Sequence, residues 1–68
     1  SDAEIWFRLT HGARIVLLAC SADRITGMSH RVANELTGWG LTTPNAQGHA
    51  LTSAGVRVRE FGKADNEH

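Results

Sequence analysis

Residues 29–55 constrain the fold of this chain more than any other stretch, and they read SHRVANELTGWGLTTPNAQGHALTSAG. A serine suited to capping a helix opens the stretch. Apolar residues then recur at intervals of three and four, as on one face of a helix: Val32, Ala33, Leu36 and Trp39. The pattern predicts a helix over about residues 29–37. Gly38 and Gly40 are suited to the positive φ of a helix exit, and we expect Trp39 to be buried between them.

A β-hairpin is the economical interpretation of residues 41–51. Two short runs with β propensity, 41–43 and 49–51, flank the turn-forming residues 44–48. We expect Leu41 and Leu51, at the base of this hairpin, to pack on the core.

The segment after the hairpin predicts a last helix. Thr52 is suited to capping it, and the helix extends to about Phe61, with Val58 and Phe61 buried. The alternation of apolar and charged residues over 56–59 leaves a strand as the alternative. We expect residues 62–68 to form a frayed acidic tail.

The amino-terminal half has the apolar spacing of helices. Between positions 5 and 20, apolar residues recur three and four apart. Thr10 and Gly12 divide this run, which favours a helix over about 10–21 preceded by a helical segment within residues 1–8. Alternation around Ile5 leaves a strand as the alternative for that first segment. The polar connector 21–27 has room for one helical turn at most, and whether a second helix lies within 22–28 stays open.

Length and charge limit the kind of protein. At 68 residues the chain has room for a single domain, 1–68, with a small core. Its formal net charge is zero. Positions 8–63 nevertheless hold all seven basic residues and three of the seven acidic ones, a net of four positive charges. The central part of the chain is therefore mildly basic, between acidic ends.

The compartment is indicated by the single cysteine and by the apolar runs. Cys20 has no second cysteine to pair with, so no disulfide forms within the chain and a reducing compartment is favoured. We expect Cys20 to be a small core residue. The longest apolar run, 15–20, is too short to span a membrane. We therefore expect a cytoplasmic protein without membrane contact.

Three short motifs carry a resemblance to a known family. They are the helix exit EL-x-x-W-G-L at 35–41, the L-T-x-x-G of 51–55 after a polar hairpin, and the LTHGARIVLLA of 9–19. Together they resemble small winged helix-turn-helix domains, in an abbreviated form with a short or missing second helix. The resemblance implies a mainly α fold with a small β-hairpin, in the order helix(-turn)-helix-wing-helix. It also implies a DNA-binding transcriptional regulator.

The same resemblance implies which residues contact DNA. The helix at 29–37 would lie in the major groove, where Arg31 is suited to guanine and Asn34 to adenine. Ser29 and His30 would contact phosphate oxygens, and the wing would contact the backbone or minor groove with Asn45, Gln47 and His49. Arg57 is a further candidate phosphate contact. Because one small module contacts few base pairs, a homodimer is expected.

Other function classes have less support from the sequence. One cysteine and four scattered histidines lack the close-spaced pairs of a structural zinc site, so no metal or other cofactor is expected. Ser29, His30 and Asp23 have no nucleophile elbow or oxyanion motif, so an enzyme is not expected. The runner-up is a protein-interaction module that does not bind DNA. It would be an adaptor, an assembly subunit or an inhibitor that docks on a larger protein through the apolar cluster Ile5, Trp6 and Phe7.

Overall fold

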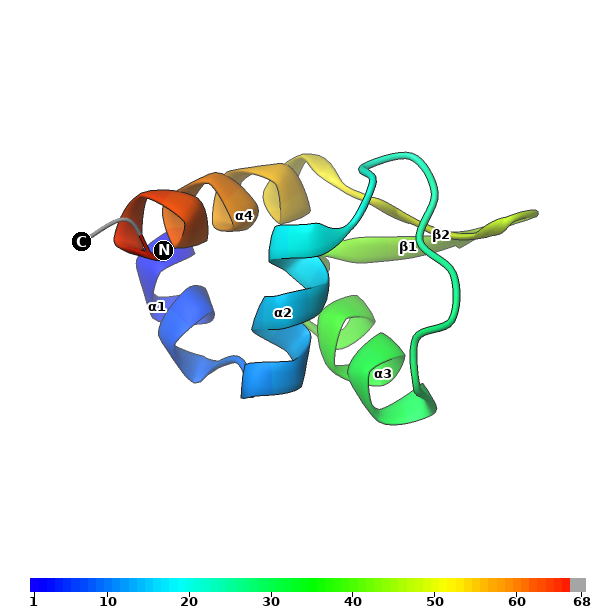
Figure 1. Cartoon of the computed structure of the whole chain (residues 1–68), viewed down its shortest axis with the longest axis horizontal. Coiled ribbons are helices and arrows are strands. Elements are labelled where there is room, and N and C mark those ends of the chain that lie inside the picture. Colours follow the sequence, from blue (N-terminus) through cyan, green and yellow to red (C-terminus); the bar gives the residue numbers. More distant parts are fainter. Residues whose placement is uncertain (67–68) are drawn as a thin grey trace.

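The computed structural model describes residues 1–66, which contain four helices and one two-stranded antiparallel sheet. In chain order they are α1 (Asp2–Arg8), α2 (His11–Ala19), α3 (His30–Gly38), β1 (Thr42–Asn45), β2 (Gly48–Leu51) and α4 (Ser53–Asn66). The prediction of a mainly α chain with a small β-hairpin is confirmed. The hairpin extends from one end of the helical body, and the amino terminus lies at the other end, next to the last turns of α4 (Figure 1).

Hydroxyl side chains cap all four helices at their amino ends. The Ser1 hydroxyl accepts from the Glu4 N–H, Thr10 from Ala13, Ser29 from Val32 and Thr52 from Gly55, at distances of 3.1–3.4 Å. Each cap satisfies a backbone donor that has no partner inside the helix. The two strand alternatives, for the segment around Ile5 and for 56–59, are therefore wrong, because both segments lie inside capped helices.

The core lies where α1, α2 and α4 meet the carboxyl end of α3. Its buried members are Trp6, Leu9, Ala13, Leu17, Leu36, Leu41 and Val58. Leu41 and Val58 are fully buried, and Leu51 and Phe61 are half-buried against the same cluster. The prediction that Leu41 and Leu51 pack on the core at the base of the hairpin is confirmed. Cys20, expected in the core, is only half-buried.

Arg14 joins α2 to the end of α1. Its Nε donates to the Trp6 carbonyl at 3.0 Å and its Nη2 donates to the Phe7 carbonyl at 3.1 Å. Its guanidinium also lies 5.2 Å from the centre of the Trp6 ring. A cation at a helix carboxyl end is favourable, and this one holds two short helices at a fixed angle.

The prediction of a frayed tail from residue 62 was wrong for residues 62–66. The helix α4 continues to Asn66, and Gly62 is buried inside it. A Cβ at Gly62 would lie 2.5 Å from atoms of the Trp6 ring, so the glycine is required by close packing of the indole. Residues 67–68 of the predicted tail lie outside the described residues.

The expectation that Trp39 is a core residue was also wrong, since the residue is 39% exposed. The Gly40 N–H donates to the Thr37 carbonyl, and the Leu41 N–H donates to the Leu36 carbonyl, each at 2.9 Å. This is a Schellman exit, with Gly40 at φ 74°. Such an exit directs the residue after the glycine, here Leu41, into the core. Gly38 lies within the helix, so the positive φ expected there is also incorrect.

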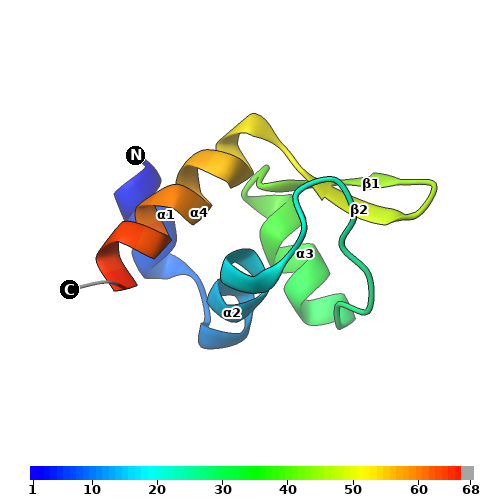
Figure 2. The same cartoon turned by 45° about the horizontal axis from the view of Figure 1, so that its top comes forward.

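The hairpin is tighter than expected. Thr42 pairs with Leu51 and Asn45 with Gly48, so Pro44 and Asn45 belong to β1 and the turn has two central residues. The connector before α3 contains no helix. Instead it runs alongside β2 (Figure 2), where Ile25 exchanges two backbone hydrogen bonds with His49 at 2.7 and 3.0 Å. A third extended segment therefore flanks the hairpin.

Candidate nucleic-acid interface

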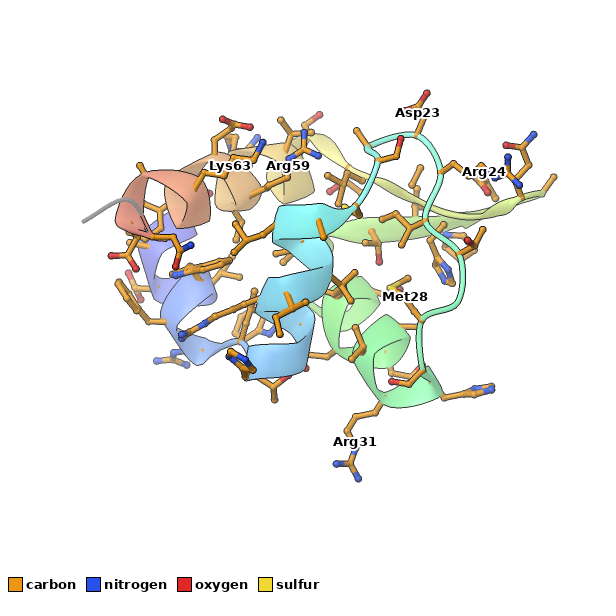
Figure 3. The ribbon with its side chains drawn as sticks, viewed as in Figure 1. Asp23, Arg24, Met28, Arg31, Arg59 and Lys63 are labelled. Atoms are coloured by element: carbon orange, nitrogen blue, oxygen red, sulfur yellow. The ribbon has the colours of Figure 1, made fainter. Side chains whose placement is uncertain are left out.

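The outer side of α3 is polar and open to solvent. Four residues at its amino end are exposed: Ser29, His30, Arg31 and Asn34. The opposite side of the helix buries Leu36 and half-buries Val32. Arg31 projects away from the body (Figure 3), and it has no ion pair within residues 1–66. The guanidinium is therefore free to bind an external partner.

Glu35 is the one acidic residue of α3, and its carboxylate is turned towards α2. Its Oε2 accepts from the Thr10 N–H at 2.8 Å, and its Oε1 accepts from the Thr10 hydroxyl at 2.6 Å. These bonds hold the negative charge at the junction of the two helices. The outer side of α3 keeps one Arg and one His, with no acidic side chain among its exposed residues.

The hairpin presents polar, uncharged side chains. Asn45 and Gln47 are exposed at the turn, and the Asn45 Oδ1 accepts from the Gln47 N–H at 2.9 Å. That bond stiffens the turn and leaves the Asn45 amide NH₂ group available. His49 is half-buried and lies further back, opposite Pro44.

A short, hydrogen-bonded link holds α3 and the hairpin together. The Thr37 and Thr42 hydroxyls lie 3.1 Å apart. The Thr52 hydroxyl donates to the Gly40 carbonyl at 2.5 Å, which joins the exit of α3 to the start of α4. The candidate residues of α3 and those of the hairpin therefore belong to neighbouring elements of fixed relative position.

Arg57 lies apart from these residues. It is on α4, and its Nε lies 3.6 Å from a carboxylate oxygen of Asp2 in α1. The cluster expected to form a protein interface is also divided: Trp6 is 3% exposed, Ile5 is half-buried, and Phe7 is 57% exposed. Of these three residues, Phe7 is the one whose side chain is mostly at the surface.

Arg24 was not among the residues that the sequence predicted to contact DNA, because it belongs to a polar connector. It precedes Ile25, whose pairing with His49 brings this part of the connector next to the hairpin. Figure 3 shows Arg24 on the hairpin side of the connector. A pairing between residues 24 positions apart leaves no local signal, although an arginine beside an isolated β-branched residue is a weak hint of an extended segment.

No match was found among protein-family models, curated proteins or solved structures.

Residues 1–66 also bear on metal sites, catalytic pockets and membrane spans. No group of three or more His, Cys, Asp and Glu side chains comes together there in a way that could hold a metal ion. A pocket of about 280 Å³ lies between α2 and the connector, lined mainly by apolar residues, with Arg24 its one charged residue. It lacks the acid and base pair that hydrolytic chemistry needs. Within the same described part, no helix is long and apolar enough to cross a membrane.

Proposed function

We propose that this chain is an abbreviated winged helix-turn-helix domain that binds double-stranded DNA as a transcriptional regulator. The observation that carries the proposal is the outer side of α3. It presents Arg31, His30 and Asn34 to solvent, while Glu35, the one acid of the helix, is held against Thr10. A polyanion that approaches α3 meets no exposed carboxylate on that helix.

In this proposal α3 enters the major groove. Arg31 donates two hydrogen bonds to a guanine edge, and Asn34 pairs with an adenine edge. Ser29 and His30, at the helix amino end, contact phosphate oxygens, where the helix dipole also favours negative charge. The Ser29 hydroxyl accepts from the Val32 N–H and keeps its own proton to donate.

The hairpin is the wing in this proposal. Asn45 and Gln47 donate to the sugar-phosphate backbone or to the minor groove beside the site of α3. His49 is half-buried and supports the hairpin from behind. We leave Arg57 out of the contact surface, because it lies beside Asp2 on α1. A single domain makes few base contacts, so a homodimer is the form in which sequence selectivity is expected.

A titration with matched variants tests this function. Fluorescence anisotropy of a labelled duplex of about 20 base pairs is measured at about 50 and about 200 mM salt. We expect binding that weakens steeply with salt, and further weakening in Arg31→Ala. Lys63→Ala is the control, because Lys63 lies on α4 far from the hairpin (Figure 3). Absence of salt-sensitive binding at micromolar protein would exclude the proposal.

A protein-interaction module is the second candidate, because large apolar side chains are exposed. Phe7 is 57% and Ile15 is 51% exposed, on two different helices. Exposed apolar side chains of this size are typical anchors of interfaces. If the wild-type chain does not bind duplex DNA but Phe7→Ser abolishes self-association or capture of a protein, this candidate is favoured.

A further inference from the structure

The hairpin has no charged side chain that would strengthen its contact with DNA. Between Thr42 and Leu51 there is no Lys, Arg, Asp or Glu. Contacts to phosphates owe most of their strength to cationic side chains and to the counterions that these displace. If the hairpin contacts a duplex, the positive charge must therefore come from another segment.

The connector is the segment that the structure places beside the hairpin. Ile25 exchanges two backbone hydrogen bonds with His49, and the Leu51 N–H donates to the Ala22 carbonyl at 2.7 Å. Ile25 is 4% exposed, so its side chain points inward. Because side chains alternate along an extended segment, Arg24 and Thr26 lie on the opposite side, and both are exposed.

The Thr26 side chain lies beside Gly48, the first residue of β2. A Cβ built at Gly48 would lie 3.4 Å from the Thr26 methyl carbon, and Gly48 pairs with Asn45 across the turn. Arg24, Thr26 and Asn45 therefore belong to the same side of this three-segment arrangement. They bring one guanidinium, one hydroxyl and one amide to one polar surface.

Arg24 is not neutralised by the acidic residue beside it. Asp23 projects from the bend of the connector away from the body, whereas Arg24 lies towards the hairpin (Figure 3). No ion pair involves Arg24 within the described part of the chain. An anion that reaches the hairpin therefore meets a free guanidinium.

We propose that Arg24, assisted by the Thr26 hydroxyl, forms a phosphate-binding site on the connector, and that this site gives the uncharged wing its attraction to the DNA backbone. The inference rests on the proposed function. The guanidinium donates to two oxygens of one backbone phosphate, and the Thr26 hydroxyl donates to the same group or to its neighbour. The site contributes affinity and carries no base preference, because phosphates are the same in every sequence.

The test measures how duplex affinity depends on salt in Arg24→Ala, Arg24→Lys and the control Lys63→Ala. For Arg24→Ala we expect the slope of log K against log [salt] to fall by about 1, and affinity at low salt to drop roughly threefold or more. Arg24→Lys retains the slope, and Lys63→Ala behaves as wild type. Because Arg24 is exposed, circular dichroism is expected to show an unchanged fold in its variants.

The outcomes separate this inference from the proposed function. If the wild-type chain binds with salt dependence but Arg24→Ala keeps the slope of the control, the Arg24 site is wrong and the proposed function stands. If the wild-type chain does not bind, both are wrong. If Arg24→Ala reduces the slope of log K against log [salt] by the same amount on duplexes of unrelated sequence, the site is supported as a contact to phosphate.

Discussion

The carboxylate of Glu35 accepts two hydrogen bonds from Thr10, one from its backbone N–H at 2.8 Å and one from its hydroxyl at 2.6 Å. Thr10 caps α2, and its hydroxyl also accepts from the Ala13 N–H. One carboxylate therefore fixes α3 against the start of α2. It also keeps negative charge off the side of α3 proposed to face DNA.

Replacement of Glu35 by alanine is expected to lower stability and to spare duplex binding. Loss of two charge-assisted bonds at a partly exposed position should reduce the free energy of unfolding by about 1–2 kcal/mol. Urea unfolding followed by circular dichroism measures this change. Glu60→Ala, on the exposed side of α4, is the control and should stay within about 0.5 kcal/mol of wild type. Equal stability of the two variants would show that the Glu35 bonds contribute little.

The contact between Gly62 and Trp6 makes a second prediction. Gly62→Ala is expected to destabilise the fold by about 1–3 kcal/mol, because the new Cβ would meet the indole ring at 2.5 Å. The control is Gly38→Ala, since Gly38 is helical and a Cβ there has nothing within 4 Å. Alanine lowers the conformational entropy of the unfolded chain relative to glycine. That variant should therefore be as stable as wild type, or more stable by up to about 1 kcal/mol. Thermal unfolding compares the two, and a stabilised Gly62→Ala would contradict the packing.

Gly48 tests the pairing between the connector and the hairpin. A Cβ at this position would collide with the Ile25 carbonyl, and the residue has a φ of 132°. We therefore expect Gly48→Ala to separate the connector from β2, seen as faster hydrogen exchange at the amides of Ile25 and His49. Gly27→Ala is the control: it also has a positive φ, but a Cβ there has open space. Unchanged exchange at Ile25 in Gly48→Ala would mean that the two segments are not coupled.

Trp6 and Phe7 are expected to respond differently to truncation. Trp6→Ala removes a buried ring and should cost about 3–5 kcal/mol, enough to unfold much of a domain of this size. Phe7 is 57% exposed, so Phe7→Ala should cost about 1 kcal/mol, chiefly from the loss of the edge contact with Phe61. Sedimentation of Phe7→Ala alongside wild type then reports on association without loss of the fold. A shift from dimer to monomer would identify Phe7 as an interface residue.

Local features of the sequence predicted most of the secondary structure. Ser29 and Thr52 cap the helices that they were expected to cap. A cap acts over three residues, and hairpin turns are similarly local, so a single sequence contains enough information for both.

Most of the wrong predictions concern residues that contact distant segments of the chain. Gly62 has the appearance of a helix end, but it is required by the ring of Trp6, 56 positions earlier. Trp39 continues the apolar spacing of α3, but the Schellman exit turns the chain so that Leu41 is buried instead. Arg24 looks like part of a linker until the connector pairs with β2. The roles of Gly62 and Arg24 depend on tertiary packing, which overrides local propensity.

The proposed function requires that the exposed side of α3 and the hairpin together form the surface that binds DNA. Mapping of amide chemical shifts by NMR tests it most directly, because every backbone amide reports separately as duplex is added. We expect shifts concentrated at residues 29–34, 24–26 and 45–49, with the amides of α1 and of the second half of α4 unchanged. Shifts confined to α1 and α4, or no shifts at all with a saturating duplex, would contradict it.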